Sequence, residues 1–440
     1  MIPTKRVYLL LTLGIILAPA VASFTKVSTG IAVILLYDAV ILTLMIIDSL
    51  RVRRSRVDVT RELPPRLSIG RDNPLKLEVK SNTSTIVKIC DYYPNTVNLN
   101  QSLLRIKVEK NTTSEVTYTA FPTKRGEFDW GNLQIRQLGA WGLAWDNWKV
   151  PQSLKVKVYP DLIGLRSLSI RLTLQSSGSM RQFRQLGIGT EFSELRNYRS
   201  GDDLRLVDWK ATARRVGASG NTSPLVRVLE PEQEQTLLIL LDRGRLMTAQ
   251  VQGLQRFDWG LNATLSLALA GLNRGDKVGV GVFDRQIHTW IPPERGQHQL
   301  SHLIDRLTPI QPVLLESDYV GAVTHVVQKQ TRRCLIVVIT DIIDTTASAE
   351  LLSALSRLTP RYLSFCVALR DPQVDIIART FTEDVQGAYT RAVALDLMAQ
   401  RQVAFAKLKG RGVLVLDAPA NQISDELVER YLQLKARNQL

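Results

Sequence analysis

Residues 189–215 hold the densest cluster of charged side chains in the sequence. Arginines and carboxylates alternate there, so charges of both signs can pair within a small unit. The arginines are Arg196, Arg199, Arg205, Arg214 and Arg215, and the acids are Glu191, Glu194, Asp202, Asp203 and Asp208. Because no histidine or nucleophile completes a catalytic set beside them, we expect a structural network that docks this segment onto a neighbouring domain, with Trp209 as its apolar anchor. A surface read by a partner protein and catalysis by the paired acids are the alternatives.

Two histidines, His298 and His302, stand four residues apart on a predicted helix. At this spacing two imidazoles can share a metal ion, but a metalloprotease helix needs a glutamate where this chain has Gln299. We therefore expect a solvated helix face. Three cysteines without zinc spacing predict neither a zinc site nor a disulfide scaffold. The sequence also lacks the GxxxxGK[ST] and GxSxG patterns, so we expect no nucleotide binding by this chain.

The elements that would position these residues differ along the chain. In residues 231–440, aliphatic runs alternate with helical patterns near 254–273, 297–307 and 424–437, which predicts a doubly wound, mainly parallel α/β sheet. Ligands bind such sheets beyond the carboxyl ends of the strands. Four acids follow predicted strands at that edge: Asp242, Asp284, Asp341 and Asp417.

The middle of the chain has two further patterns. Residues 57–160 alternate apolar and polar positions in short runs broken by turn residues, which predicts an antiparallel β-sandwich domain. Residues 161–230 are polar, rich in glycine and arginine and poorly periodic, and we interpret them as a connector that carries the charged motif.

Two apolar runs, 7–23 and 29–47, open the chain and predict a transmembrane helical hairpin in residues 1–56. Basic residues flank both outer ends, so we expect both termini and the folded domains on the cytoplasmic side of the inner membrane. A cleaved signal peptide in the first run and two buried core helices are the alternatives. Asp38, in the middle of the second run, should have a partner: a helix or subunit contact, or else Tyr37 or water.

The net charge of +15 is unevenly distributed. Its excess falls from +5 in residues 1–56 to +1 in residues 231–440, as expected if basic surface faces the anionic cytoplasmic leaflet. A nucleic-acid binder more often concentrates basic charge in one module with aromatic platforms. We therefore expect the lipid bilayer as a partner, with nucleic acid at the basic connector as the weaker alternative.

The motif also carries a family resemblance. The stretch with Glu191, Arg196, Tyr198, Gly201, Asp202, Asp203, Arg205, Asp208, Trp209 and Arg214 resembles the signature of the bacterial domain-of-unknown-function family 58. That family is similar to von Willebrand factor A proteins, and its members often pair with MoxR-type AAA+ ATPases. The resemblance implies a membrane hairpin, a β-rich segment and a C-terminal von Willebrand A-like α/β domain, and it implies a separate ATPase as partner.

The same resemblance implies a degenerate metal site. An A-like domain usually binds a divalent cation with Asp-x-Ser-x-Ser after its first strand, but here Arg243 and Arg245 follow Asp242 and both serines are missing. Asp341 is kept, and Asp318 lies near the expected threonine loop. We expect no cofactor, with magnesium as the alternative, and we expect Arg243 or Arg245 to pair with Asp242 or Asp341 in place of the ion.

These observations lead to one functional hypothesis and one alternative. We expect a non-enzymatic, membrane-anchored cytoplasmic adaptor that works with a MoxR-type AAA+ ATPase in envelope protein maturation or assembly. The alternative is a divalent-metal-dependent hydrolase that uses Asp242, Asp318 and Asp341 at the A-like crevice.

Overall fold

The computed structural model describes residues 1–24, 27–179, 191–219, 223–230, 235–343, 348–381 and 384–437. The chain divides into two compact units, Met1–Asp161 and Leu162–Leu440. Both are mixed structures of helices and sheets, which confirms the predicted α/β class in its broad form.

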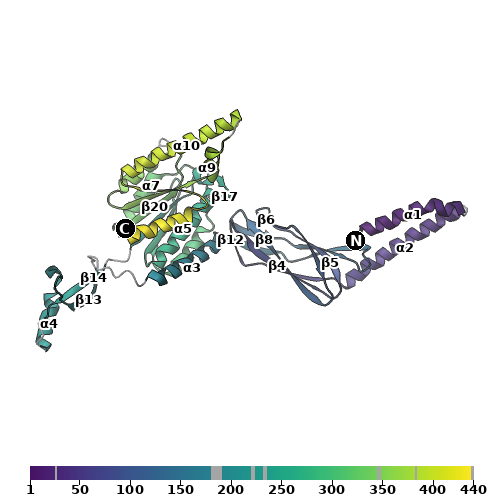
Figure 1. Cartoon of the computed structure of the whole chain (residues 1–440), viewed down its shortest axis with the longest axis horizontal. Helices are drawn as coiled ribbons and strands as arrows, with labels where there is room; N and C mark the ends of the chain where they lie inside the picture. The colour runs from purple at the N-terminus through teal and green to yellow at the C-terminus, as the bar shows by residue number, and fades with distance from the viewer. Residues whose placement is uncertain are drawn as a thin grey trace. The chain divides into compact units, whose positions relative to one another are not determined.

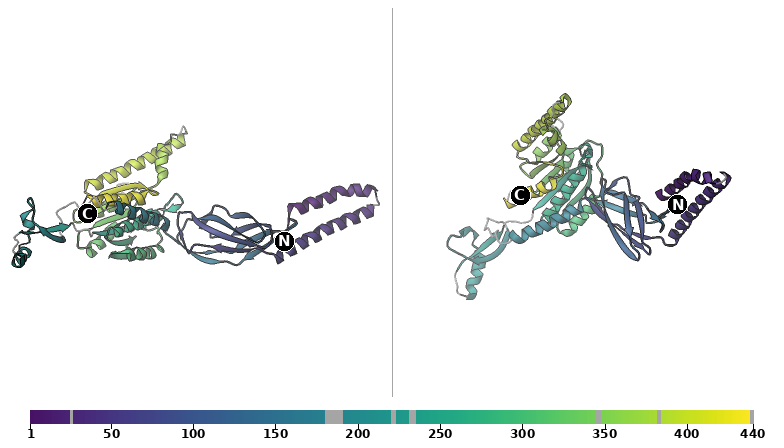
Figure 2. Two further views of the ribbon diagram at one scale, coloured as in Figure 1. Left: turned by 60° about the horizontal axis from the view of Figure 1, so that its bottom comes forward. Right: turned by 45° about the vertical axis from the view of Figure 1, so that its right-hand side comes forward.

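The first unit begins with two apolar helices, α1 (Lys5–Phe24) and α2 (Val27–Arg54), which lie side by side in every view (Figures 1 and 2). They pack through Val7, Ile41 and Met45. One segment among the described residues, Gly30–Arg54, is long and apolar enough to cross a membrane. The predicted span at residues 7–23 lies partly among side chains that the structure does not describe, so a second span stays a prediction.

The rest of the first unit is built from short strands in three sheets. The strand orders are β1-β11-β10-β5-β7, β2-β4-β8-β6 and β3-β12-β9, and only β3 and β12 pair in parallel. The strands are β1 (Ile2–Pro3), β2 (Asp58–Glu62), β3 (Arg66–Ser68), β4 (Asn73–Ser81), β5 (Thr85–Asp91), β6 (Val97–Leu99), β7 (Leu103–Val108), β8 (Thr112–Pro122), β9 (Gly126–Trp130), β10 (Leu133–Leu138), β11 (Ala144–Val150) and β12 (Leu154–Tyr159). Alternate residues of β4 and β7 are buried, as their sequence period requires.

A buried carboxylate joins α2 to the sheets within this unit. Asp48 accepts hydrogen bonds from the backbone amides of Trp141, Leu143 and Ala144, at 3.0 to 3.3 Å. A Cβ at Gly139 would lie 2.1 Å from the Asp48 carboxylate, so only glycine allows this approach. The helices and the β structure therefore form one packed unit, whereas the sequence suggested two separate segments.

The second unit is organised around a six-stranded sheet with the order β19-β18-β15-β20-β21-β22. Its strands are β15 (Thr236–Asp242), β18 (Lys277–Phe283), β19 (Ile287–Glu294), β20 (Leu335–Thr340), β21 (Leu363–Arg370) and β22 (Leu414–Pro419). All pairs are parallel except β18 with β19. All six residues of β20 are buried, because helices cover both faces of the sheet.

One face is covered by α3, α5, α6 and α11, and the other by α7, α8 and α10. The helices are α3 (Leu162–Ser179), α5 (Arg256–Asn273), α6 (Gln297–Leu307), α7 (Tyr319–Lys329), α8 (Ala349–Leu358), α9 (Pro372–Arg379), α10 (Val385–Gly410) and α11 (Ile423–Ala436). Two short strands, β16 (Gln250–Val251) and β17 (Leu254–Gln255), and a 3-10 turn, η2 (Arg245–Thr248), precede α5. Leu165, Leu168 and Leu172 of α3 belong to the core, so part of the predicted connector is a packed helix.

The charged motif forms a small antiparallel hairpin with a helix between its strands. The elements are β13 (Glu191–Asn197), the 3-10 turn η1 (Leu204–Leu206), α4 (Trp209–Ser219) and β14 (Leu225–Glu230), and together we call them the motif hairpin. Gly201 has a φ of +105°, a conformation that favours glycine at the turn after β13.

Candidate functional site

The parallel strands bring the predicted acids to one edge of the sheet. Asp242 ends β15, Asp284 follows β18, Asp341 follows β20 and Asp417 lies within β22. Because the carboxyl ends of parallel strands meet at the same edge, these side chains lie along one edge of the sheet. We call Asp242, Asp341 and Asp417, together with the groups that bond to them, the carboxyl-end cluster.

Asp242 is fully buried and has every oxygen occupied by protein donors. One carboxylate oxygen accepts from the Ser317 hydroxyl at 2.5 Å and from the Gly244 amide at 2.8 Å. The other accepts from the Thr340 hydroxyl at 2.7 Å and the Tyr319 hydroxyl at 2.9 Å. Burial raises the pKa of Asp242 and also raises the pKa of Tyr319, which keeps the tyrosine a hydrogen-bond donor. These donors stand where a cation would have to bind.

Asp341 is held by two guanidinium groups. Arg256 lies 2.8 Å from one carboxylate oxygen, and Arg401 lies 2.6 Å from the other. The second amino group of Arg401 reaches Asp417 at 2.9 Å, and Arg370 contacts Asp417 at 3.0 Å. Arg401 lies on α10, one of the helices that cover the sheet. Its guanidinium group therefore joins the ends of two strands, β20 and β22.

We predicted that Arg243 or Arg245 pairs with Asp242 or Asp341 in place of a metal ion, and this prediction was wrong. Arg243 pairs with Asp284 at 2.8 Å, because its backbone amide is bonded to Phe283 at the end of the neighbouring strand. Arg245 points to solvent and pairs with the exposed Glu316 at 2.8 Å. The guanidinium groups at Asp341 come from Arg256 and Arg401, and no local spacing in the sequence marks them.

Asp318 lies outside the carboxyl-end cluster. Its side chain is exposed and caps α7 by accepting a hydrogen bond from the Gly321 amide at 2.7 Å. Its neighbour Ser317 is the residue that reaches Asp242. The structure thus does not assemble Asp242, Asp318 and Asp341 as one ligand set. Within the described part of the chain, no group of three or more histidine, cysteine or acidic residues could hold a metal ion.

The histidines on α6 face solvent, whereas Gln299, next to His298, has a structural role. His298 and His302 are exposed. The Gln299 amide is buried and donates to the carbonyl groups of Val278 and Pro292, both at 2.9 Å. Gln299 thereby ties α6 to the edge of the sheet.

The motif hairpin pairs its own charges. Arg196 binds Asp202 through both amino groups, at 2.5 and 2.7 Å, and the Arg199 amide also donates to Asp202. The bond from Arg196 holds the pKa of Asp202 below its usual value. Asp203 accepts from the amide of Arg205 at the start of η1. The sequence therefore correctly predicted pairing of opposite charges within this segment.

Asp208 organises the other end of the motif hairpin. Its carboxylate caps α4 through the Ala211 amide at 3.0 Å and binds Arg227 of β14 at 2.8 Å. The hydrogen bond from the Ala211 amide is the main reason that the pKa of Asp208 is lowered. Helix α4 and strand β14 are thereby joined through one side chain.

Trp209 is not an apolar anchor among the described residues. Its side chain is 65% exposed at the start of α4, whereas Val207, just before the helix, is buried and pairs with Val226 of β14. Leu204 is equally exposed. Of the other motif residues, Arg205 and Arg214 face solvent, Gly201 lies at a turn, and Tyr198 is half-buried just after β13. Glu191 lies in β13, and its side chain is outside the described part of the chain.

Asp38 lies half-buried on α2 without the predicted support from Tyr37. The Tyr37 hydroxyl donates instead to the Leu10 carbonyl of α1, at 3.2 Å. One carboxylate oxygen of Asp38 is buried and has no hydrogen-bond partner within the residues that the structure describes. A carboxylate in this position remains a candidate for a contact with another helix.

Fold and site together define a mixed α/β chain with an apolar helix pair, whose carboxyl-end cluster is filled by its own side chains. A family model described as "Protein of unknown function DUF58" matches residues 194–395, which supports the resemblance carried by the motif. Uncharacterized proteins of Mycobacterium bovis and Mycobacterium tuberculosis are 23% identical over 215 residues. These alignments cover 48% of this chain and 65% of each relative, which is less than two thirds of their length.

Two solved structures are similar over the same share of the chain. One is described as conserved hypothetical protein BatB from Bacteroides thetaiotaomicron, with 14% identity and a TM-score of 0.31. The other is described as an aerotolerance-related membrane protein from Bacteroides fragilis, with 15% identity and a TM-score of 0.31. Each match covers 46% of this chain and 99% of the other.

Proposed function

We propose that this chain is a non-enzymatic, membrane-anchored cytoplasmic adaptor whose von Willebrand A-like domain binds a MoxR-type AAA+ ATPase in envelope protein maturation or assembly. One observation carries the proposal: the carboxyl-end cluster is closed by its own donors. Four donors occupy Asp242, and two guanidinium groups occupy Asp341. Because neither Asp242 nor Asp341 has a free carboxylate, the carboxyl-end cluster suits surface recognition better than metal-assisted hydrolysis.

The membrane anchor in this proposal is the pair α1 and α2, with both spanning the inner membrane. Segment Gly30–Arg54 has the length and hydropathy of a span. Arginines occupy its last turn, at Arg51, Arg53 and Arg54, and Arg6 precedes the apolar part of α1. Since cytoplasmic flanks are enriched in lysine and arginine, this arrangement favours both termini, the sheets of the first unit and the whole second unit on the cytoplasmic side.

The docking surface in this proposal is the segment 313–316, which lies beside the carboxyl-end cluster. Leu314 is 78% exposed in a segment that is bonded to the end of β15: the Val313 amide donates to Arg243, and the Arg245 amide donates to Leu315. Beside it lies the exposed ion pair of Arg245 and Glu316. An apolar side chain with charged neighbours is a common composition for a protein-binding rim.

A crosslinking pull-down from native membranes tests the proposal with the full-length chain. We expect a MoxR-type ATPase to be recovered with the wild type and to be lost with Leu314→Asp. The matched control is Tyr389→Asp, which introduces the same charge at an exposed position of α10, and it should leave recovery unchanged. Absence of the ATPase from the wild-type sample would contradict the partner, and loss with Tyr389→Asp alone would move the docking surface to α10.

Isothermal titration addresses the hydrolase alternative. Magnesium, manganese or calcium should give no binding heat at the carboxyl-end cluster, because a cation would have to displace Arg256 and Arg401 from Asp341. Saturable heat that disappears in Asp242→Asn would revive the metal-dependent alternative.

A further inference from the structure

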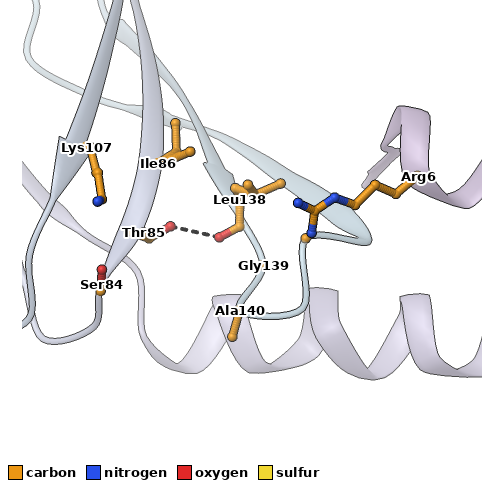
Figure 3. A pocket seen from close by; sticks show the side chains of 9 residues that line it. Arg6, Ser84, Thr85, Ile86, Lys107, Leu138, Gly139 and Ala140 are labelled. Carbon is orange, nitrogen blue, oxygen red and sulfur yellow. Dashed lines mark hydrogen bonds between the residues drawn. The ribbon is translucent and has the colours of Figure 1, made fainter.

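A basic pocket lies in the first unit, where α1 meets the sheets. It has a volume of about 160 Å³ and is lined by Arg6, Lys107, Ser84, Thr85 and the loop 138–142. Figure 3 shows Lys107 and Arg6 on opposite sides of it, with Thr85 and the loop between them. Its walls thus come from α1, β5, β7 and the connection between β10 and β11.

The two cations of the pocket are available to a ligand. Both side chains are exposed, and neither has a carboxylate partner within the described ranges of the chain. Gly142 has a φ of +69°, and a Cβ there would lie 2.8 Å from the Arg6 guanidinium. The loop therefore lets Arg6 lie against its backbone. Thr85 is fixed by a hydrogen bond to the Leu138 carbonyl at 2.8 Å, which ties the loop to β5.

The pocket lies beside the first turn of α1 and the last turns of α2. Arg6 immediately precedes the buried Val7 of the helix pair, and the loop beyond Leu138 is bound to Asp48 near the end of α2. Its level in the unit is thus set by both helices.

Cations also stack on tryptophans of the 141–148 segment, which follows the pocket loop. Arg51 lies 4.3 Å from the ring of Trp141, Lys88 lies 4.7 Å from Trp145, and Arg56 lies 4.8 Å from Trp148. Tryptophan is enriched at membrane interfaces, where its ring lies among the headgroups. With α1 and α2 in the membrane, as proposed above, a pocket with two cations beside these tryptophans would face the phosphates of the lipids.

We propose that this pocket binds the phosphate headgroup of an anionic phospholipid from the cytoplasmic leaflet, with Arg6 and Lys107 as the charge partners and Ser84 as a hydroxyl donor. This inference rests on the proposed membrane anchor. A guanidinium can bind a phosphate through two amino groups, and an ammonium supplies a second positive charge across the pocket. The lipid would fix the height of the first unit at the membrane surface.

Native mass spectrometry of the full-length chain, released from nanodiscs of phosphatidylglycerol and phosphatidylcholine, tests the site. We expect the wild type to retain phosphatidylglycerol in preference to phosphatidylcholine. Retention should fall about fivefold for each cation removed in Arg6→Gln, Lys107→Gln and the double variant. The matched control is Lys110→Gln, which removes an exposed charge just beyond β7 but outside the pocket, and it should retain lipid as the wild type does.

Three outcomes would overturn the proposal, and they are distinguishable. Equal retention by the double variant and the wild type, with both proteins still membrane-bound, would remove the site and leave the anchor. Release of the wild type from membranes by carbonate would remove the anchor and the site together. Inorganic phosphate that displaces the lipid at millimolar concentration, and binds the wild type but not the double variant, would assign the pocket to a soluble phosphate.

Discussion

The carboxyl-end cluster and the motif hairpin use the same chemistry in different surroundings. In the cluster, Arg401 and Asp341 have side chains that are only 7% and 5% exposed. In the hairpin, Arg196 and Asp202 are 28% and 17% exposed. A buried ion pair is costly to break because it leaves an uncompensated charge, whereas water screens a pair near the surface. The conspicuous motif is therefore the weaker of the two networks.

The two regions also differ in how far apart their partners lie in the chain. Arg196 and Asp202 are six residues apart, and the turn at Gly201 brings them together. Arg401 and Asp341 are 60 residues apart and meet only because α10 packs on the sheet. Density of charge along a sequence thus marks local pairing, and it does not mark the pairs on which the fold depends most.

The largest effect should follow from Arg401→Met. This change leaves the buried Asp341 and the partly buried Asp417 with one guanidinium partner each, and we expect the free energy of unfolding of the second unit to fall by about 3 to 5 kcal/mol. Hydrogen exchange at the amides of β20 and β21 measures it. Arg227→Met, which removes an exposed partner of Asp208, is the control and should cause a much smaller loss. Equal losses would abolish the contrast between the two regions.

Asp242→Asn should have an intermediate effect that depends on pH. Because burial raises the pKa of Asp242, the unfolded chain releases its proton near pH 4 while the folded chain keeps it. Wild-type stability therefore declines as pH rises from about 4 toward the raised pKa. We expect the variant to be less stable by about 1 to 2 kcal/mol near pH 5, with the gap narrowing toward pH 7 in thermal melts. A gap that widens with pH would mean that the ionised form is favoured.

Asp202→Asn should show the opposite pH dependence at a smaller scale. Arg196 lowers the pKa of Asp202, so its contribution is present above about pH 4 and is lost as pH falls through the lowered pKa. Hydrogen exchange at the Arg199 amide, which donates to this carboxylate, should be faster in the variant at pH 7 than in the wild type. The difference should shrink as the pH approaches 3. An equal difference at both pH values would show that the ion pair does not protect this turn.

Trp209→Ala should have the smallest effect on stability. The side chain is largely exposed, so we expect a change within about 0.5 kcal/mol in the stability of the motif hairpin. Val207→Ala is the control, because Val207 is buried beside β14 and its truncation should cost about 2 kcal/mol. Hydrogen exchange of β14 compares them. A large loss with Trp209→Ala would restore the docking role that the sequence suggested.

Local patterns predicted the elements well. The helix expected near 297–307 is α6, and the one expected near 424–437 is α11, shifted by one residue. The alternating runs around Leu75 and Leu104 are strands β4 and β7. These predictions succeeded because the buried face of a helix or strand produces a regular spacing of apolar residues. That spacing can be recognised within a short stretch of sequence.

The partners within the candidate site could not be predicted in the same way. Tyr319 and Thr340 reach Asp242 across 77 and 98 residues. Arg243 stands next to Asp242 in the chain, yet strand geometry directs it to Asp284. Proximity in sequence was therefore a poor guide at the edge of a parallel sheet, where each neighbour comes from a different strand.

The apolar helices, the alternating strands, the parallel sheet with acids at its edge and the paired charges of the motif could all be predicted from the amino-acid sequence, because each depends on residues close together in the chain. Three features could be seen only in the folded chain: guanidinium and hydroxyl groups occupy the acids, Trp209 is exposed, and Arg6 and Lys107 share a pocket. Those features depend on which elements pack together, and packing brings together residues whose separation in the chain carries no local signal.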